Sequence, residues 1–339
     1  MKASIFDVAK KSGLSVVTVS RVINNSGTVR EKNRLKVLEA MKELDYYPNA
    51  AARSLARGKT GIIGLTLTTL HDSFLDAVVK EINDRLTESG YFLALSIITG
   101  ADQPIYPTIF QEDRVDGLIL LCPINEDQYA MELKKKKIPF IMLDNQQKNP
   151  SVSSVMVDNF KGGYDAARHL IDLGHKDIAH ISGPSSYLSS RERERGFLAA
   201  MEEADLTPSR VEQGDFSITS GYEIASSWLA SGHLPTAIFA ADDLLAMGVM
   251  DALKNSGVLI PEDVSIVGFD DHIYAAEFRP RLTTVRQPAD KIGRLGVDIL
   301  LKLIHDPTKR NTTQVLAPEL IVRESTCRYK ERGTDYRSE

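Results

Sequence analysis

The chain has 339 residues, of which 42% are hydrophobic and 26% charged, values that are ordinary for a globular protein with two or three folding units. No apolar run reaches the roughly 18 residues that span a bilayer, and the N-terminus lacks the apolar stretch of a secretory signal. The net charge of −5 is uneven, because residues 1–60 carry +7 and the rest −12. This basic head suits a polyanionic partner, although chance clustering of charges on solvated helices explains it equally well.

Both cysteines, Cys122 and Cys327, are isolated in the sequence and form no CxxC pair. We interpret them as buried thiols in a reducing compartment. Together with the missing secretory signal, they favour the cytoplasm.

Residues 1–47 have the pattern of three short helices. Ser4 and Asp7 have the spacing of an N-terminal capping box, and Gly13 suits the left-handed end of the first helix. Ser15 is placed to cap the second helix. Apolar residues that we expect to face the core are Val19, Val22 and Ile23 in the second helix, and Leu35, Leu38, Met41 and Leu44 in a third helix at about 31–44.

The second helix has the features of a DNA-reading helix. A helix-turn-helix unit places the start of its second helix in the major groove, where apolar side chains contact thymine methyl groups. Val16 and Val17 would lie there. Polar candidates for base or phosphate contacts are Thr18, Ser20, Arg21 and Asn24. A plain three-helix bundle with valines in its core is the alternative.

A separate short helix is predicted after Pro48, with Asn49 as its cap and Gly58 at its end. So short a helix is unstable alone in water. Pairing with a second copy, and insertion of Leu55 into the minor groove, would stabilise it. Taken in isolation, a linker that happens to be helical is the favoured interpretation of this segment.

From residue 61 onward, apolar strand-like runs alternate with amphipathic helices, which is typical of doubly wound parallel sheets. About 270 residues are too many for one sheet, so we expect two sheets facing a cleft, with a crossing near Val157–Asn159. The helices are predicted at 74–89, 126–136, 159–173, 189–204, 220–231, 243–256 and 288–305.

Polar residues follow several of these strands, where open α/β sheets bind their ligands. The acids are Asp144, Asp242, Asp243, Asp270 and Asp271, and the segment SSRERERGF adds Arg191, Arg193 and Arg195. Carboxylates accept hydrogen bonds from hydroxyl groups, an arginine donates in return, and Phe74 and Phe216 could stack on a ring. The pattern suits a polyol or sugar. Helix capping is the alternative for each acid, and we expect it for Asp243 and Asp271.

The chain resembles the lactose-repressor (LacI/GalR) family of bacterial transcription regulators. The matching stretches keep the family's order and cover nearly the whole chain: IFDVAKKSGLSVVTVSRVIN, LDYYPNAAARSLA, LIDLGHKDIAHISGP, ADDLLAMG, IVGFDD and RPRLTTVRQP. Because motifs of the DNA-binding head and of the body occur together, the match is highly specific.

The resemblance implies a helix-turn-helix head with a hinge helix, and a periplasmic-binding-protein-like body of two subdomains joined by three crossovers. The later crossings would lie near Gln287–Pro288 and Pro318. The limits expected are a head at 1–47, a hinge at 48–60, a body at 61–332 (subdomains 61–157 with 288–317, and 158–287 with 318–332) and a tail at 333–339.

The family's functional positions carry over residue by residue. Arg193, Asp242 and Asp270 match effector-contacting positions, and Asp144 and Phe216 match positions that line the cleft of sugar-responsive members. In the DNA-binding part, the hinge positions are Asn49, Ala52, Arg53 and Leu55.

Three departures limit this transfer. Asp242 is an Asn in many relatives, which puts ligand contact there in doubt. Pro104 and Pro107 should interrupt a helix that is usually unbroken at 99–114. Val16 and Val17 differ from better-known relatives, so the operator sequence cannot be copied from them.

Other chemistry finds little support in the sequence. None of the seven histidines forms an HxxxH or HExxH pair, and neither a phosphate-binding loop nor a nucleophile elbow occurs. We therefore predict no enzyme, no metal and no cofactor. A periplasmic sugar-binding protein would explain the body, but the basic head and the missing signal argue against it.

We predict a cytoplasmic, homodimeric repressor that binds double-stranded operator DNA and is controlled by a small effector in the cleft, a sugar or sugar derivative. A sugar phosphate, a sugar acid and a nucleobase remain open as effectors. The resemblance also leaves room for a protein corepressor, and no membrane partner is expected.

Replacing Leu55 by Ala should weaken operator binding, because the side chain that unstacks the central base step is lost. Effector binding should stay intact. A gel-shift titration checks this, and unchanged operator affinity would remove the hinge mechanism.

Overall fold

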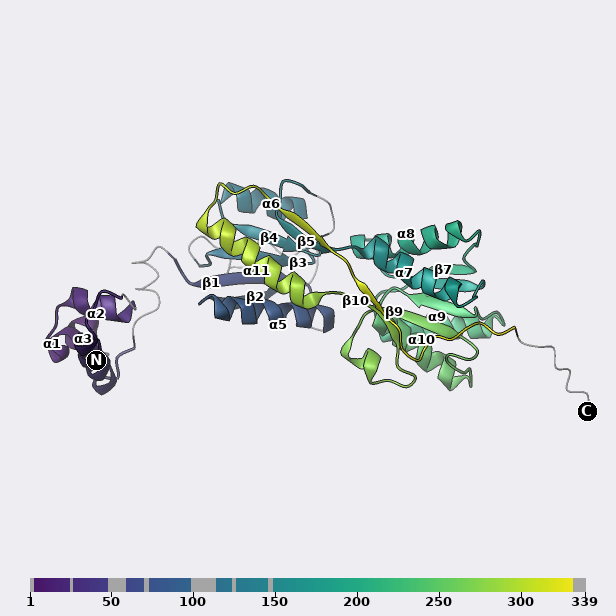
Figure 1. Cartoon of the computed structure of the whole chain (residues 1–339), viewed down its shortest axis with the longest axis horizontal. Coiled ribbons are helices and arrows are strands. Elements are labelled where there is room, and N and C mark those ends of the chain that lie inside the picture. The colour runs from purple at the N-terminus through teal and green to yellow at the C-terminus, as the bar shows by residue number, and fades with distance from the viewer. Residues whose placement is uncertain are drawn as a thin grey trace, which may run out of the picture. The chain divides into compact units, whose positions relative to one another are not determined.

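The computed structural model describes seven ranges of the chain: residues 3–24, 27–47, 59–69, 73–98, 114–123, 126–145 and 149–331. Contacts divide the molecule into a small N-terminal unit and a large unit that begins at Ile62, both drawn in Figure 1. Three predictions fall outside the described residues. They concern the hinge helix with its four DNA-binding positions, the proline-containing stretch 99–113 and the tail after residue 331.

Three helices form the N-terminal unit: α1 Ile5–Ser12, α2 Val16–Ile23 and α3 Glu31–Glu43. The predicted helix ends are confirmed. The Ser4 hydroxyl accepts a bond from the Asp7 backbone and the Asp7 carboxylate accepts one from the Ser4 backbone, which completes the capping box. Gly13 ends α1 with a φ of 69°, and Ser15 caps α2.

The core of this unit confirms the stripe predicted for α2 and corrects the one predicted for α3. Val19 and Val22 are buried, with Ile23 packed beside them. In α3, however, Leu35 is 58% exposed and Leu38 45% exposed. A constant spacing of three residues drifts around a helix, so the predicted set could not share one face. The stripe in contact with the core is Val37, Ala40, Met41 and Leu44.

The first sheet of the large unit has six parallel strands in the order β11-β5-β4-β3-β1-β2. The strands are β1 Ile62–Leu67, β2 Phe92–Ile97, β3 Gly117–Leu121, β4 Phe140–Leu143, β5 Ser154–Val157 and β11 Thr313–Leu316. The helices of this subdomain are α5 Ser73–Glu88, α6 Glu126–Lys135 and α11 Ala289–His305.

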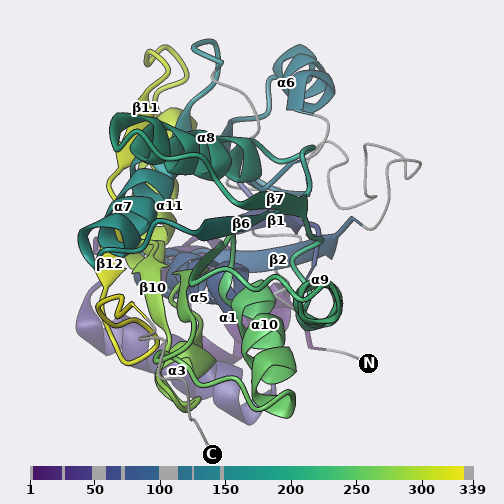
Figure 2. The same cartoon turned by 90° about the vertical axis from the view of Figure 1, so that its right-hand side faces the viewer.

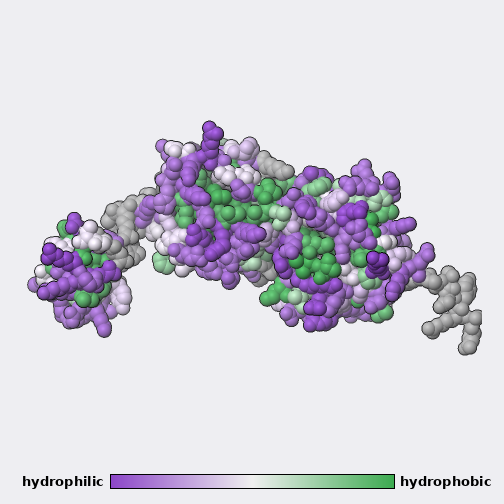
Figure 3. All heavy atoms as spheres, in the orientation of Figure 1, coloured by the Kyte–Doolittle hydropathy of each residue, from purple (hydrophilic) through white to green (hydrophobic). Residues whose placement is uncertain are grey.

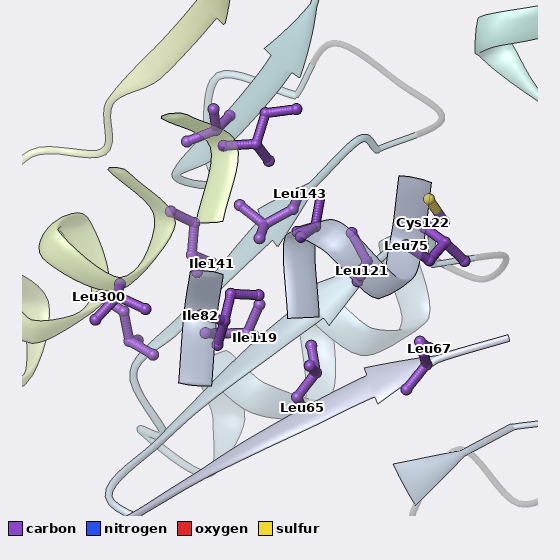
Figure 4. Close-up of a cluster of buried hydrophobic side chains, with 14 of the residues drawn as sticks. Leu65, Leu67, Leu75, Ile82, Ile119, Leu121, Cys122, Ile141, Leu143 and Leu300 are labelled. Carbon is purple, nitrogen blue, oxygen red and sulfur yellow. The ribbon is translucent and has the colours of Figure 1, made fainter. Parts of the chain in front are cut away.

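Helices α5 and α11 pack against one face of this sheet. Alternate residues of the central strands, such as Ile119 and Leu121 in β3, join side chains of both helices in one buried cluster (Figure 4). All five residues of β3 are buried, as expected for a parallel strand inside a sheet. Cys122 lies at the end of the cluster where β3 finishes.

The second sheet has the order β12-β10-β9-β8-β6-β7. Its strands are β6 Ile178–Ser182, β7 Arg210–Gln213, β8 Ala237–Ala240, β9 Ser265–Asp270, β10 Thr283–Arg286 and β12 Glu319–Ile321. Its helices are α7 Asn159–Asp172, α8 Leu188–Glu203, α9 Ile218–Ala230, α10 Asp243–Asn255 and the short η2 Ile273–Ala276. Only β12, at the edge, pairs antiparallel.

The second sheet is covered on both faces, α7 and α8 lying on one and α9 and α10 on the other (Figure 2). Glycines allow the paired helices to touch through their backbones. A Cβ on Gly163 of α7 would lie 2.1 Å from the carbonyl oxygen of Arg193, and one on Gly196 of α8 would lie 2.0 Å from that of Phe160. This contact fixes the backbone of Arg193.

The chain passes between the two sheets three times: between β5 and α7, between β10 and α11, and between β11 and β12. The first five strands of each sheet have the same spatial order, 2-1-3-4-5. In this topology the strand order reverses beside the first strand, and ligands bind at that point beyond the carboxyl ends of the strands.

The predicted fold class is therefore confirmed: a helix-turn-helix head and two doubly wound α/β subdomains. No helix within the described ranges is long and apolar enough to cross a membrane. One detail needs correction, because Cys122 is buried but Cys327, close to the chain's C-terminal end, is partly exposed.

His180, in the middle of β6, is fully buried between the rings of Phe197 and Phe239. Its Nδ1 pairs with the carbonyl oxygen of Phe239 at 2.8 Å, whereas its Nε2 has no hydrogen-bond partner. Burial lowers the pKa of His180 from 6.5 to about 4. The folded protein therefore holds this side chain neutral.

Because the pKa of His180 is lower in the folded state, the unfolded chain takes up a proton first as the pH falls. The free energy of unfolding should decrease between pH 6.5 and pH 4, by on the order of 3 kcal/mol from this group. Urea titrations across this window should show a shallower decrease for His180→Phe than for the wild type. A replacement of the exposed His305 serves as control, and equal slopes for His180→Phe and wild type would contradict the expectation.

Candidate functional site

The first turn of α2 presents an apolar side chain to solvent. Val17 is 61% exposed, although it lies on a helix whose other valines are buried. Val16, predicted beside it as a base contact, is half-buried and packs on the core of the head. Of the two, Val17 is therefore the side chain free to meet a base.

Polar residues continue the exposed face of α2. Arg21 is exposed, whereas Thr18, Ser20 and Asn24 are half-buried. The Asn24 amide donates to the Ser20 hydroxyl at 3.4 Å. The structure thus places one exposed cation and three polar side chains around Val17, all from a single helix of the head.

The large unit contains a cleft of about 340 Å³, a volume suited to a small ligand. All six residues predicted to bind an effector line it: Phe74, Asp144, Arg193, Phe216, Asp242 and Asp270. They come from both subdomains, since Phe74 belongs to α5 and Asp144 follows β4 in the first, and the other four belong to the second.

Arg193 is the most constrained of these side chains and is only 4% exposed. Its Nε donates to the side-chain oxygen of Asn159 at 2.9 Å, and its Nη1 to the carbonyl oxygen of Ala241 at 2.6 Å. Its Nη2 lies 3.3 Å from the carboxylate of Asp270, and the guanidinium stacks 3.7 Å from the ring centroid of Phe269. Arg193 thereby ties α8 to α7 and to the ends of β8 and β9.

Adjacent aspartates at two strand ends divide their roles, and here two predictions were wrong. Asp242 caps α10 through the Leu245 amide at 2.8 Å, whereas Asp243, expected to be a cap, is buried and accepts bonds from Thr284 and His272. Burial raises the pKa of Asp243 well above its usual value.

Asp271, the other expected cap, forms ion pairs instead. It lies 2.7 Å from Arg286 and 2.5 Å from Arg323. Neighbouring residues at a strand end point in opposite directions, so only one member of each aspartate pair can face the cleft. That member is Asp242 in the first pair and Asp270 in the second.

Four lining residues have a positive φ, which is uncommon outside glycine: Cys122 (49°), Asp144 (48°), Phe216 (64°) and Asp270 (107°). Cys122, Asp144 and Asp270 lie where β3, β4 and β9 end, and the left-handed backbone turns the chain out of the sheet there. Such conformations concentrate at functional sites because the surrounding structure must hold them.

The ring of Phe216 rests directly on the backbone of Gly183. A Cβ at Gly183 would lie 2.1 Å from that ring, so only glycine leaves room for it. Tyr187 packs against the same ring, with centroids 6.0 Å apart at 59°. The cleft therefore has an aromatic side as well as a carboxylate-rich one.

Several lining residues were missed in the sequence. Thr68, Cys122 and Gln287 each follow the end of a strand, so the strand-end rule applied to every strand would have found them. Tyr187, Ser189 and Asp215 carry no comparable signal, because loops and the start of α8 bring them to the cleft. Among the described residues, no group of His, Cys, Asp and Glu could hold a metal ion.

A helix-turn-helix head in front of a two-subdomain body with a cleft defines a DNA-binding regulator. Residues 4–49 match the model of the lacI family of bacterial regulatory proteins, and residues 167–326 match a periplasmic binding protein-like domain. A curated relative, the HTH-type transcriptional repressor PurR of Photobacterium profundum, is 35% identical over 95% of this chain and 98% of its own. The chain therefore belongs to the lacI family and is a DNA-binding transcriptional repressor, not an enzyme.

Solved structures agree with this assignment. The Lac repressor dimer bound to operator and the anti-inducer ONPF is similar with a TM-score of 0.87 and 31% identity, covering 96% of this chain and 100% of that one. The transcriptional regulator CelR in complex with cellobiose has a TM-score of 0.73 and 30% identity, covering 95% and 99%.

Replacing Arg193 by Ala should lower the free energy of unfolding by about 3–5 kcal/mol, because Asp270 would remain buried without its cation and Asn159 would lose its donor. The exposed Arg191, two residues away on α8, is the matched control, with an expected loss within about 0.5 kcal/mol. Urea denaturation of both variants measures the difference. Equal stability of the two would show that the contacts of Arg193 do not hold the subdomain together.

Proposed function

We propose that the cleft binds a small carbohydrate effector and that its occupancy controls the affinity of a homodimer for operator DNA. The observation that carries the proposal is the lining itself: carboxylates at strand ends, one fixed guanidinium and two phenylalanines. Carboxylates accept bonds from hydroxyl groups, and an aromatic ring stacks on the apolar face of a sugar. Ring stacking would serve a nucleobase as well, so the carboxylates favour the carbohydrate.

The homodimer is supported by apolar side chains left exposed on the large unit. Strand β2, at the edge of the first sheet, exposes Phe92, Leu95 and Ile97. The second subdomain exposes Ile218, Tyr222, Ile273, Tyr274 and Phe278, and hydrophobic surface appears in this subdomain on the face drawn in Figure 3. Exposed apolar surface of this extent, on an open sheet edge, is typical of an interface. The Lac repressor neighbour is a dimer.

The coupling would run through the arrangement of the two subdomains. A ligand that contacts both sides of the cleft favours one arrangement, and it shifts the equilibrium only by its preference between the two, about 5.5 kcal/mol for a swing from 99:1 to 1:99. We propose the sequence-based limits as functional units, with head 1–47, hinge 48–60 and body 61–332. Folding of the hinge against DNA would then report the state of the cleft. The protein would act where operator DNA lies, in the cytoplasm.

Val17 is expected to read bases, since it is the exposed valine of α2. Val17→Ala should weaken operator binding about fivefold to tenfold, through loss of apolar contact with a base, while the stability of the head stays unchanged. Fluorescence anisotropy with a selected operator fragment measures the affinity.

Val19→Ala is the contrasting variant, because Val19 is fully buried in the head. It should destabilise the head by about 2 kcal/mol. If selection from random DNA returned the same site and the same affinity for Val17→Ala as for the wild type, Val17 would not be a base contact.

A further inference from the structure

Gln287 stands out in the wall of the cleft. It follows β10 at the point where the chain leaves the second subdomain for α11, and it is 5% exposed. Its Nε2 donates to the carboxylate of Asp270 at 2.6 Å. Its Oε1 is buried and has no hydrogen-bond partner.

The carboxylate fixes which way this amide faces. Only the NH2 group can approach Asp270, because turning the amide over would bring two acceptor oxygens together. The oxygen must therefore face away from Asp270. A buried acceptor without a donor is costly, so a donor that reaches it from the cleft would stabilise the complex.

The rest of the lining shares this bias toward acceptors. Among the described lining residues there are four carboxylates, those of Asp144, Asp215, Asp242 and Asp270, and one guanidinium. Three of the five N–H groups of Arg193 are already directed to Asn159, Ala241 and Asp270. The cleft therefore offers many acceptors and little unspent positive charge.

We propose that the effector is an uncharged, hydroxyl-rich molecule, such as an unmodified mono- or disaccharide, and that Gln287 Oε1 accepts a hydrogen bond from one of its hydroxyl groups. This inference rests on the carbohydrate effector proposed above and narrows it. A phosphate or carboxylate would meet carboxylates at close range, where like charges repel and no unspent cation compensates. Sugar phosphates and sugar acids are thereby excluded.

The first test uses the full chain and matched probes. Thermal shift and titration calorimetry compare glucose, ribose, galactose and cellobiose with glucose 6-phosphate, ribose 5-phosphate, gluconate, adenine and hypoxanthine. We expect at least one neutral sugar to bind, and each bound sugar to bind at least tenfold more tightly than its phosphorylated or oxidised counterpart.

A tighter phosphate or acid, a hit confined to the nucleobases, or a panel without any hit overturns the inference. Operator binding is measured in the same samples. If it persists and a sugar phosphate alters it, the proposed carbohydrate control stands while the charge argument fails. Loss of operator specificity in all samples would instead refute the proposed function.

The second test isolates Gln287. With the sugar that binds best, a series of deoxy analogues should reveal one hydroxyl whose removal weakens binding by about 10–100-fold in the wild type. Gln287→Met should erase the discrimination at that hydroxyl and keep it at the others. A merely structural role would weaken all analogues alike.

Gln213→Met is the matched control, because Gln213 is an exposed glutamine at the end of β7 that does not line the cleft. It should leave the whole series unchanged. If Gln287→Met also leaves affinity and discrimination unchanged, Gln287 does not contact the effector.

Discussion

The cleft depends on a single buried cation. Arg193 reaches from α8 to Asn159 at the start of α7, to the backbone beyond β8 and to Asp270 at the end of β9, with Phe269 beneath it. A buried guanidinium is tolerated only when its donors are satisfied and a counter-charge is near. Both conditions hold because Gly163 and Gly196 let the two helices touch. The ligand-facing wall is thus set by helix packing on the far side of the sheet.

The two sheets contribute to the cleft by the same rule. Each has the same order of five strands, so each presents its strand ends at an equivalent place. Three short passages of chain connect them, and one of these begins at Gln287, in the cleft wall itself. A ligand bound there touches both subdomains and one of their covalent connections. This arrangement makes the cleft suited to controlling a separate head.

The sequence was sufficient for the elements and for most of the site, for physical reasons that differ between them. Alternation of buried strands with amphipathic helices predicted the helices to within two residues at most ends, and the strand-end rule found Asp144, Asp242 and Asp270. Capping residues at Ser4, Gly13 and Ser15 were identified because the signals are local.

Features that depend on tertiary packing were not accessible in this way. The phase of α3 was wrong because Leu35 and Leu38 are apolar but lie off the stripe that contacts the head core. Which aspartate of each pair faces the cleft depends on Thr284 and Arg323, residues distant in the chain. The left-handed backbone at four cleft residues likewise has consequences for how ligand preference can change. Side chains branched at Cβ are strained at a positive φ, whereas Asn, Asp and Gly tolerate it. At Asp144 and Asp270 the accessible repertoire is therefore narrow, and a lineage that acquires a new inducer must alter the aromatic and hydroxyl-bearing positions instead.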